Sequence, residues 1–284
     1  MRSLKKTRLE ISQNIIKLGG RGPVLVHSDV MGALGLIEKK SNSLEIISGH
    51  LNSIEQIIEE KQSYFPTFNY NFPSSKHYDV KNDVSQVGPL SEYYRKHIAR
   101  WRSSIPIFNV CGKTPADINE VDTNVLTTID PFGPGSFFDY LYKTRGVVLF
   151  YGARIESFTG IHFAEQLSGG PLYRYDKIFT GDVSCMNGQI AKTKLKYHVR
   201  PLGRLIQYDF DKIWDLICEE GLGYEFHIPS ATIKAFNFHA VVNTLLTKIA
   251  NNPFFMLSQA NASIWEKEYN RLGRRVIASD FEHT

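Results

Sequence analysis

Three polar side chains follow a buried strand at a spacing that suits proton transfer. Thr159, His162 and Glu165 lie three residues apart, shortly after the apolar run at 147–152. Residues i and i+3 share one face of a helix, so the pattern predicts a hydroxyl, an imidazole and a carboxylate that point the same way. Open α/β sheets place their chemistry at the carboxyl ends of strands. A histidine oriented by a carboxylate can then act as a general base near neutral pH.

His162 taken alone also fits a structural role, because a single histidine in a helix is commonly a hydrogen-bonded core residue. The neighbouring Glu165 and Thr159 make the catalytic interpretation about equally good. We expect no metal, because the His-x-x-Glu spacing lacks the second histidine of a His-Glu-x-x-His zinc site.

A second polar group, His27-Ser28-Asp29, ends the apolar strand predicted at 24–26. Neighbours in an extended chain point to opposite faces, so three consecutive residues do not form a catalytic triad. The Gly-x-Ser-x-Gly motif of a serine nucleophile is also missing around Ser28. We predict that this loop holds a ligand oxygen through its backbone N–H groups and its hydroxyl. A helix or turn cap formed by Ser28 or Asp29 is the alternative.

Other segments combine turn-forming, basic and aromatic residues. Two glycines and two prolines at 130–136 precede a predicted helix. Such a helix start attracts phosphate, although a plain turn explains the same residues. The P-loop and Rossmann glycine motifs are missing, which disfavours nucleotide hydrolysis and dinucleotide chemistry. The guanidinium groups of Arg95 and Arg102 suit a phosphate or carboxylate ligand. The alternative is that both are solvated surface residues. The aromatic stretch at 64–72 suits a sugar ring or a core.

The elements that must position these residues alternate along the first part of the chain. We predict strands at 24–26, 107–111 and 147–151 and helices at 44–60, 89–100 and 136–143. This alternation argues for a sheet between helices. After residue 170, an Asn187-Gly188 hairpin turn is followed by predicted helices at 209–220, 231–249 and 260–272. The predicted class is α/β with a C-terminal α+β portion.

Composition narrows the possible partners. The 284 residues are 42% hydrophobic and 22% charged, which is ordinary for a globular protein. No apolar run approaches the roughly 18 residues that suggest a membrane span, so we expect no membrane partner. Three widely spaced cysteines fit a reduced, cytoplasmic protein. The net charge of +4 suits a phosphate-bearing small molecule at least as well as a nucleic acid, and we expect no nucleic-acid partner.

Six segments, in order between about residues 20 and 175, resemble the aminoglycoside 3-N-acetyltransferase family. They are Val24-Leu25-Val26-His27-Ser28, Phe65-Pro66-Thr67-Phe68, Val87-Gly88-Pro89-Leu90-Ser91-Glu92-Tyr93-Tyr94-Arg95, Arg102-Ser103, Pro131-Phe132-Gly133 through Ser136, and Thr159 to Glu165. The resemblance implies the antibiotic acetyltransferase fold, a mixed central β-sheet flanked by helices that is unrelated to the GNAT superfamily. It also implies an α/β acyl-CoA-binding and catalytic core at 1–175. Residues 176–284 would add a hairpin and helices that complete the same domain and the substrate pocket.

The resemblance implies transfer of an acyl group from acetyl-CoA or another acyl-CoA to a sugar amine, without a metal or a covalent acyl-enzyme. His162 would be the base, Glu165 would orient it or hold the amine, and Thr159 would lie near the thioester. The predicted cofactor contacts are His27, Ser28, Asp29, Arg102, Gly133 and Ser136. The predicted substrate contacts are Tyr64, Asn69, Tyr70 and Glu165.

Departures from the family pattern bear on the substrate. Drug-modifying members usually carry histidine before the proline that follows the Arg-Ser pair, where this chain has Ile105-Pro106. The loop at 68–72 and the C-terminal helices look more similar to sugar-biosynthesis members such as the anthrose-pathway N-acyltransferase. The leading hypothesis is therefore a nucleotide-linked amino sugar, for example a dTDP-4-amino-4,6-dideoxyhexose. An aminoglycoside is the alternative acceptor, and a non-catalytic binding protein of the same fold is the second alternative. We expect a monomer or homodimer.

Overall fold

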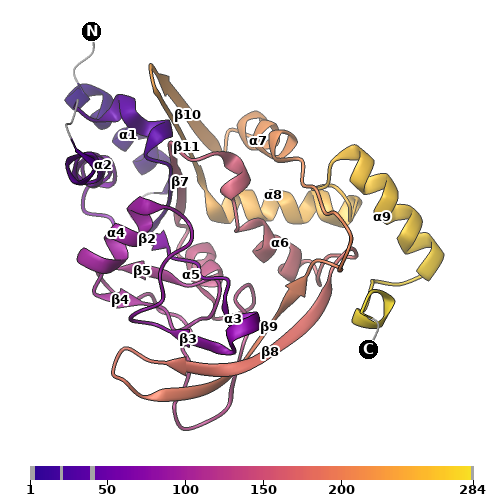
Figure 1. Ribbon diagram of the computed structural model, residues 1–284. Coiled ribbons are helices and arrows are strands. Elements are labelled where there is room, and N and C mark those ends of the chain that lie inside the picture. The colour runs from indigo at the N-terminus through magenta and orange to yellow at the C-terminus, as the bar shows by residue number, and fades with distance from the viewer. Residues whose placement is uncertain (1–3, 20–21, 39–41, 283–284) are drawn as a thin grey trace.

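The computed structural model describes residues 4–19, 22–38 and 42–282 as two β-sheets, of which the larger has helices on both faces (Figure 1). The larger sheet contains β1 (Val24–Ser28), β2 (Ser63–Pro66), β4 (Trp101–Arg102), β5 (Val110–Gly112), β7 (Val147–Tyr151), β10 (Gly223–Ile228) and β11 (Ala231–Asn237). The smaller sheet contains β3 (His77–Asp79), β6 (Thr127–Ile129), β8 (Tyr175–Ser184) and β9 (Ile190–Val199). Their orders are β10-β11-β7-β1-β2-β5-β4 and β3-β8-β9-β6.

Helices and short 3-10 turns connect these strands. The helices are α1 (Leu4–Gly19), α2 (Ser43–Ile58), α3 (Phe72–Ser75), α4 (Pro89–His97), α5 (Phe137–Lys143), α6 (Ile161–Leu167), α7 (Phe210–Glu219), α8 (Phe238–Asn251) and α9 (Gln259–Leu272). The 3-10 turns are η1 (Met31–Leu36), η2 (Ile155–Ser157) and η3 (Ala278–Asp280). Among the described helices, none combines the length and apolar character needed to cross a membrane.

Side chains that alternate along the central strands fill two separate cores. Val24 and Val26 of β1 pack with α1, α2 and α4 on one face of the sheet. Leu25 packs with α5, α6, α7 and α8 on the other face. His27 stacks on Phe150 of β7 at 5.2 Å, so it points to the face that carries α6. The predicted mixed sheet flanked by helices is confirmed.

The pairing of β1 with β7 brings two candidate segments to one edge of the sheet. The strands are parallel, with Ser28 opposite Tyr151, so their carboxyl ends lie side by side. Gly152 follows β7 with a φ of 70°, and a Cβ there would lie 2.4 Å from the carbonyl oxygen of Asp29. Only glycine permits this approach. The loops after β1 and β7 therefore start in contact.

The predicted helix at 231–249 is wrong in its first part. Residues 231–237 form β11, and the helix α8 begins only at Phe238. β11 forms a hairpin with β10 and also pairs with the distant strand β7, so hydrogen bonds on both sides outweigh local helical preference. Asn237 then caps α8 by accepting the N–H of Ala240 at 2.9 Å.

One further boundary differs from prediction, and one turn agrees. The predicted strand at 107–111 starts later, because Ile107 has a φ of 67° that no strand accommodates. The hairpin of β8 and β9 turns at Asn187-Gly188 as predicted, with Gly188 at a φ of 82°.

Candidate active site

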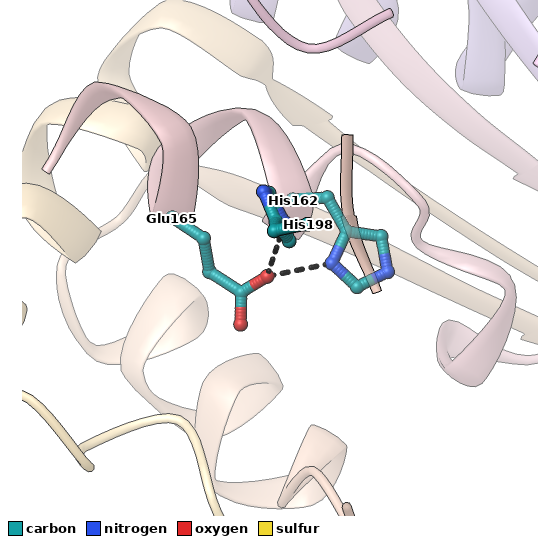
Figure 2. A group of neighbouring side chains, drawn as sticks. All are labelled: His162, Glu165 and His198. Atoms are coloured by element: carbon teal, nitrogen blue, oxygen red, sulfur yellow. Dashed lines mark hydrogen bonds and ion pairs between the residues drawn. The ribbon is translucent and has the colours of Figure 1, made fainter. Parts of the chain in front are cut away.

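His162 and Glu165 form a hydrogen-bonded pair on one turn of α6. His162 Nδ1 lies 2.7 Å from Glu165 Oε2 (Figure 2). A carboxylate only accepts hydrogen bonds, so Nδ1 carries the hydrogen and Nε2 holds the lone pair. The His162 side chain is 19% exposed, whereas the Glu165 side chain is 1% exposed. Within the described chain no hydrogen bond reaches Nε2, which leaves this nitrogen available to a substrate proton.

The Glu165 carboxylate accepts hydrogen bonds from four side chains. Oε2 accepts from His162 Nδ1 and from His198 Nε2 at 3.1 Å. Oε1 accepts from the hydroxyls of Tyr173 and Tyr208, each at 2.6 Å. A carboxylate offers about four acceptor positions, and these donors occupy them. The geometry therefore favours orientation of His162 by Glu165 over the alternative, direct contact with the substrate amine.

Burial and charge set the protonation states of this cluster. Burial alone raises the pKa of Glu165, but the charge of His162 and hydrogen bonds from His162 and His198 hold it well below its ordinary value. Burial lowers the pKa of His162 to about 4, against the opposing effect of Glu165. Burial and the Glu165 charge keep the pKa values of Tyr173 and Tyr208 well above normal, so both remain donors. At neutral pH the imidazole of His162 is an unprotonated base.

His162, Glu165 and His198 lie close enough together to be considered as metal ligands. One ligand atom each from His162, Glu165 and His198 lies within 4.8 Å of the others. Tetrahedral zinc with bonds of about 2.0–2.2 Å separates its ligand atoms by roughly 3.3 Å. The 2.7 Å between His162 Nδ1 and Glu165 Oε2 is shorter and is the length of a charge-assisted hydrogen bond. The arrangement fits a proton-transfer network better than a metal centre.

Sequence reasoning missed three members of this site. His198 ends β9, Tyr173 precedes β8 and Tyr208 precedes α7. All three follow α6 in the chain, at least eight residues from Glu165, and two of them belong to the part after residue 175. Alternation along β9 places His198 on the face of Lys192, Lys194 and Lys196, so the local pattern predicts an exposed side chain and only the tertiary structure shows its burial. Phe132, from the predicted glycine-rich turn, contacts His162 edge-on at 5.3 Å between ring centroids.

The predicted cofactor loop lines a cavity of about 210 Å³. His27 is 6% exposed, and its Nε2 has no hydrogen-bond partner in the described chain. Ser28 Oγ is likewise buried without a partner among the described residues. Thr159 and Tyr70 also line this cavity. Buried polar atoms are normally satisfied, so their orientation toward a cavity fits a ligand that hydrogen-bonds with them.

A test of the His27 environment is the pH dependence of stability. Burial lowers the pKa of His27 from 6.5 to about 4. A depressed pKa means that the unfolded chain binds the proton more readily, so stability is complete above pH 6.5 and falls as the pH drops toward 4. We expect His27→Phe to remove up to about 3 kcal/mol of this pH-dependent loss. Urea unfolding at several pH values measures it. Parallel curves for the two proteins would contradict a buried neutral His27.

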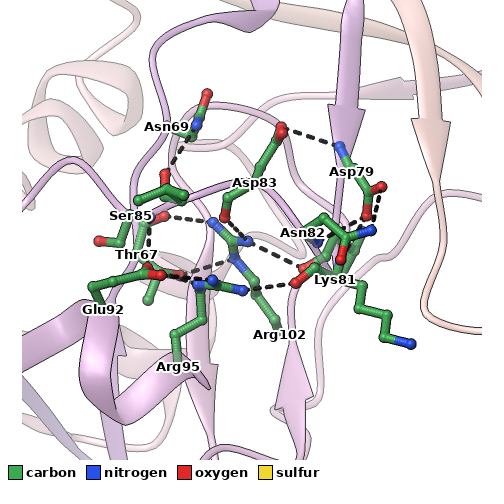
Figure 3. Close-up of polar contacts among 12 residues, drawn as sticks. Thr67, Asn69, Asp79, Lys81, Asn82, Asp83, Ser85, Glu92, Arg95 and Arg102 are labelled. Carbon is green, nitrogen blue, oxygen red and sulfur yellow. Dashed lines mark hydrogen bonds and ion pairs between the residues drawn. The ribbon is translucent and has the colours of Figure 1, made fainter. Parts of the chain in front are cut away.

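Arg102 borders a cavity of about 510 Å³ beside α4, but its guanidinium is occupied by groups of the chain. Its side chain is buried, and its guanidinium donates to the carbonyl oxygens of Thr67, Val80 and Asp83 and to Asn109 Oδ1 (Figure 3). These bonds join the 80–83 loop to the end of β2. The geometry therefore favours a structural role for Arg102 over a contact with cofactor.

Four other predicted contacts also serve the fold. Tyr64 is fully buried and packs edge-on against Phe137. Asn69 Nδ2 donates to the carbonyl oxygen of Val84 at 2.9 Å. Ser136 caps α5, and Gly133 packs against the side chain of Asp130. Each group is occupied within the chain, so these residues are poor candidates for direct ligand contacts.

Two loop residues differ from their predicted arrangement. Asp29 Oδ1 accepts the N–H of Met31 at 2.9 Å in the turn that leads into η1, which matches the turn-cap alternative. Thr159 lies before α6, which begins at Ile161, and its hydroxyl donates to the carbonyl oxygen of Ser157 at 3.3 Å. The prediction that Thr159 shares a helical face with His162 is therefore wrong. The tight turn at 158–160 places Thr159 on the cavity beside Ser28 instead.

The fold is similar to that of several solved aminoglycoside acetyltransferases. AAC(3)-Xa is 17% identical with a TM-score of 0.64, and the match covers 88% of this chain and 93% of that chain. AAC-IIIb bound to CoASH is 16% identical with a TM-score of 0.63, covering 86% and 96%. A mutant of AAC(3)-IVa in complex with a gentamicin is 16% identical with a TM-score of 0.60, covering 90% and 93%. A search of curated proteins found no match.

The sequence itself places the chain in a family. The model of the aminoglycoside 3-N-acetyltransferase family matches residues 50–249, which is most of the chain. The protein belongs to this family, as the sequence resemblance implied. It is therefore an acyl-CoA-dependent N-acetyltransferase with acyl-CoA as co-substrate, and the non-catalytic alternative is set aside.

Proposed function

We propose that the protein acetylates an amine of an aminoglycoside, using acetyl-CoA. The observation that carries this proposal is His162, with a hydrogen on Nδ1 held by buried Glu165 and a lone pair on Nε2. A histidine in this state accepts a proton from an attacking amine. The family membership and the match to enzymes solved with a gentamicin and with sisomicin support the choice of acceptor.

The proposed reaction needs one proton transfer and no covalent enzyme intermediate. The amine nitrogen attacks the thioester carbonyl while His162 Nε2 takes its proton, and the resulting imidazolium is stabilised by Glu165. The carbon–sulfur bond then breaks, the thiolate of CoA receives the proton, and an amide remains. Ser28 Oγ and His27 Nε2, which line the 210 Å³ cavity, are the proposed hydrogen-bond partners of the acyl-CoA chain.

An acidic cavity next to the site supports a cationic acceptor. A space of about 510 Å³ is lined by Glu156, Asp209, Asp211 and Tyr208. Among the described residues that line it, no lysine or arginine occurs. Tyr208 connects this space to the base, with 5.8 Å between its ring and that of His162. Carboxylates attract a polycationic sugar and repel phosphates, which favours an aminoglycoside over a nucleotide sugar in this space.

The acidic cavity predicts a charge-dependent KM. Asp211 is exposed, and its replacement by asparagine removes one attraction worth about 0.2–1 kcal/mol. We expect Asp211→Asn to raise the KM for an aminoglycoside roughly 1.4- to 5-fold, with kcat nearly unchanged and the difference shrinking at high salt. Asp117→Asn, an exposed carboxylate in the 113–119 loop, is the matched control. Equal KM values for both variants would count against cation binding in this cavity.

A nucleotide-linked amino sugar is the second candidate acceptor. It is favoured by another cavity of about 510 Å³, lined by Lys81, Lys96, Arg100 and Trp101, whose charges and aromatic ring suit a nucleotide. Lys96 lies in the last turn of α4, where a basic residue complements the negative end of the helix dipole. This effect explains part of the basic lining without a ligand. The sugar-biosynthesis assignment rests on this observation and on the sequence departures described above.

Release of free thiol distinguishes the two acceptors. The protein is incubated with acetyl-CoA and either gentamicin, sisomicin or dTDP-4-amino-4,6-dideoxyglucose, and thiol is measured with a chromogenic disulfide. We expect rapid release with an aminoglycoside and background release with the nucleotide sugar. The reverse pattern would establish the second candidate. Release with neither acceptor, while acetyl-CoA still raises the melting temperature, would refute both proposed acceptors.

A further inference from the structure

The Glu165 carboxylate is one link in a longer chain of hydrogen bonds. His198 Nε2 lies 3.1 Å from Glu165 Oε2, and His198 Nδ1 lies 3.2 Å from Gln166 Oε1. Gln166 Nε2 then donates to Asp130 Oδ2 at 3.0 Å. The chain thus runs from Asp130 through Gln166, His198 and Glu165 to His162. It joins the turn after β6, helix α6 and the end of β9.

The carboxylates of Asp130 and Glu165 accept hydrogen bonds only, so they determine which group donates in each hydrogen bond of the chain. Asp130 accepts from the amide nitrogen of Gln166, so the amide oxygen of Gln166 faces His198 Nδ1. An amide oxygen only accepts, and therefore Nδ1 of His198 must donate. Glu165 also only accepts, and therefore Nε2 of His198 must donate as well. Both ring nitrogens of His198 then carry hydrogen, which makes the ring an imidazolium.

The charges around this chain agree with a cationic His198. The groups that act on its two carboxylates are Tyr173, Arg174, Asp176 and Tyr208 from other elements and Lys196 from β9 itself. Arg174 Nε donates to the Tyr208 hydroxyl at 3.1 Å, and Lys196 pairs with Asp176 at 3.3 Å. Among the described residues whose charges act on these two carboxylates, Lys196 is paired with Asp176, which leaves Arg174 to offset them when His198 is neutral. A charged ring balances them, which matters because buried charge without a partner is costly.

We propose that His198 is a positioning residue that carries a hydrogen on both ring nitrogens, fixes Glu165 and keeps His162 unprotonated between turnovers. This role rests on the proposed function of His162 as base. His198 is 2% exposed, so it acts through Glu165 and has no direct access to substrate. Its ring lies 5.6 Å from that of His162, close enough for a positive charge to oppose protonation of His162.

The proposal is tested without substrate, by ring 15N NMR of protein labelled at histidine. Ring nitrogens that carry hydrogen and those that hold a lone pair resonate in separate ranges. At pH 7 we expect both ring nitrogens of His198 to give N–H type signals. For His162 we expect one N–H type signal, from Nδ1, and one lone-pair signal, from Nε2. Signals are assigned by their loss in His198→Gln, or by ring-to-backbone correlations in the native protein if that variant does not fold. A lone-pair nitrogen at His198 would overturn the proposal, because it would mean that Gln166 is reversed and Asp130 protonated.

His198→Gln supplies the second measurement. A glutamine nitrogen reproduces the donor to Glu165 without the charge. We expect the titration midpoint of His162 to rise by roughly half to two pH units, as expected for losing a like charge at this separation. His239→Gln, on α8 and hydrogen-bonded to the carbonyl oxygen of Tyr142, is the control and leaves the midpoint unchanged. An unchanged midpoint in a folded His198→Gln would also overturn the proposal. Failure to acetylate any amine, with these NMR results intact, would refute the proposed function alone.

Discussion

Replacing His162 with glutamine is expected to lower kcat by about 100- to 10,000-fold, the range typical of a lost general base. A glutamine amide can still donate to Glu165, so the buried carboxylate keeps a partner and the fold survives. It has no lone pair at the position of Nε2 that accepts a proton near neutral pH. The KM for acetyl-CoA should change little, because the cavity lined by His27 and Ser28 is untouched. Steady-state thiol release with saturating acetyl-CoA and an active acceptor measures the effect.

The control for His162→Gln is the same substitution at a histidine outside the site. His239→Gln changes a half-buried histidine on α8 that hydrogen-bonds a backbone carbonyl. We expect its kcat to stay within about twofold of the native value. Activity of His162→Gln above one-tenth of native, with a normal melting temperature, would remove His162 from the role of base.

Glu165→Gln is the second large effect, and it combines activity with stability. The native carboxylate receives four donors, and an amide replaces one acceptor oxygen with an NH2 group that faces them. Removing one partner from a buried charged network costs about 3–5 kcal/mol of unfolding free energy. His162 also loses the bond that selects its tautomer. We expect kcat to fall about 100-fold or more and urea unfolding to show the loss of stability.

The pH dependence of this variant adds an independent check. The pKa of Glu165 is held well below 4.5 in the folded protein, so its stabilising contribution is complete above that pH and is lost as the pH falls further. In Glu165→Gln this acid-dependent loss should be smaller. Glu266→Gln, an exposed change on α9, is the control and should leave stability and its pH dependence as they are. Native-like stability for Glu165→Gln would show that the network contributes little.

The sequence predicted the central elements of the fold well, and it failed where distant pairing decides. The strand at 147–151 and the helix at 137–143 carry strong local patterns, so both lie close to their predicted positions. The helix predicted at 231–249 failed in its first part because β11 pairs on one side with its hairpin partner β10 and on the other with β7, which is distant in sequence. Ordered motif segments could identify the family even though each motif alone is weak.

The ligand contacts were harder to predict than the base. Tyr64, Asn69 and Arg102 have side chains that suit sugar or phosphate, and each of them is instead buried in the protein. Residue type cannot distinguish a polar group that serves a ligand from one that satisfies the chain itself. His27 and Ser28 differ from these residues because their buried polar atoms have no partner within the described chain.

The sequence by itself determined the pair His162 and Glu165, because a spacing of three residues within one helical turn brings the two side chains together in any fold. Only the tertiary structure decided that Glu165 faces inward, since its other donors come from β9 and from the segments before β8 and α7. Tertiary packing also explains Gly160, where a Cβ would lie 2.6 Å from the rings of Phe158 and Phe238. Local spacing can specify which groups react, whereas their protonation depends on burial and charge from distant segments, which only folding brings together.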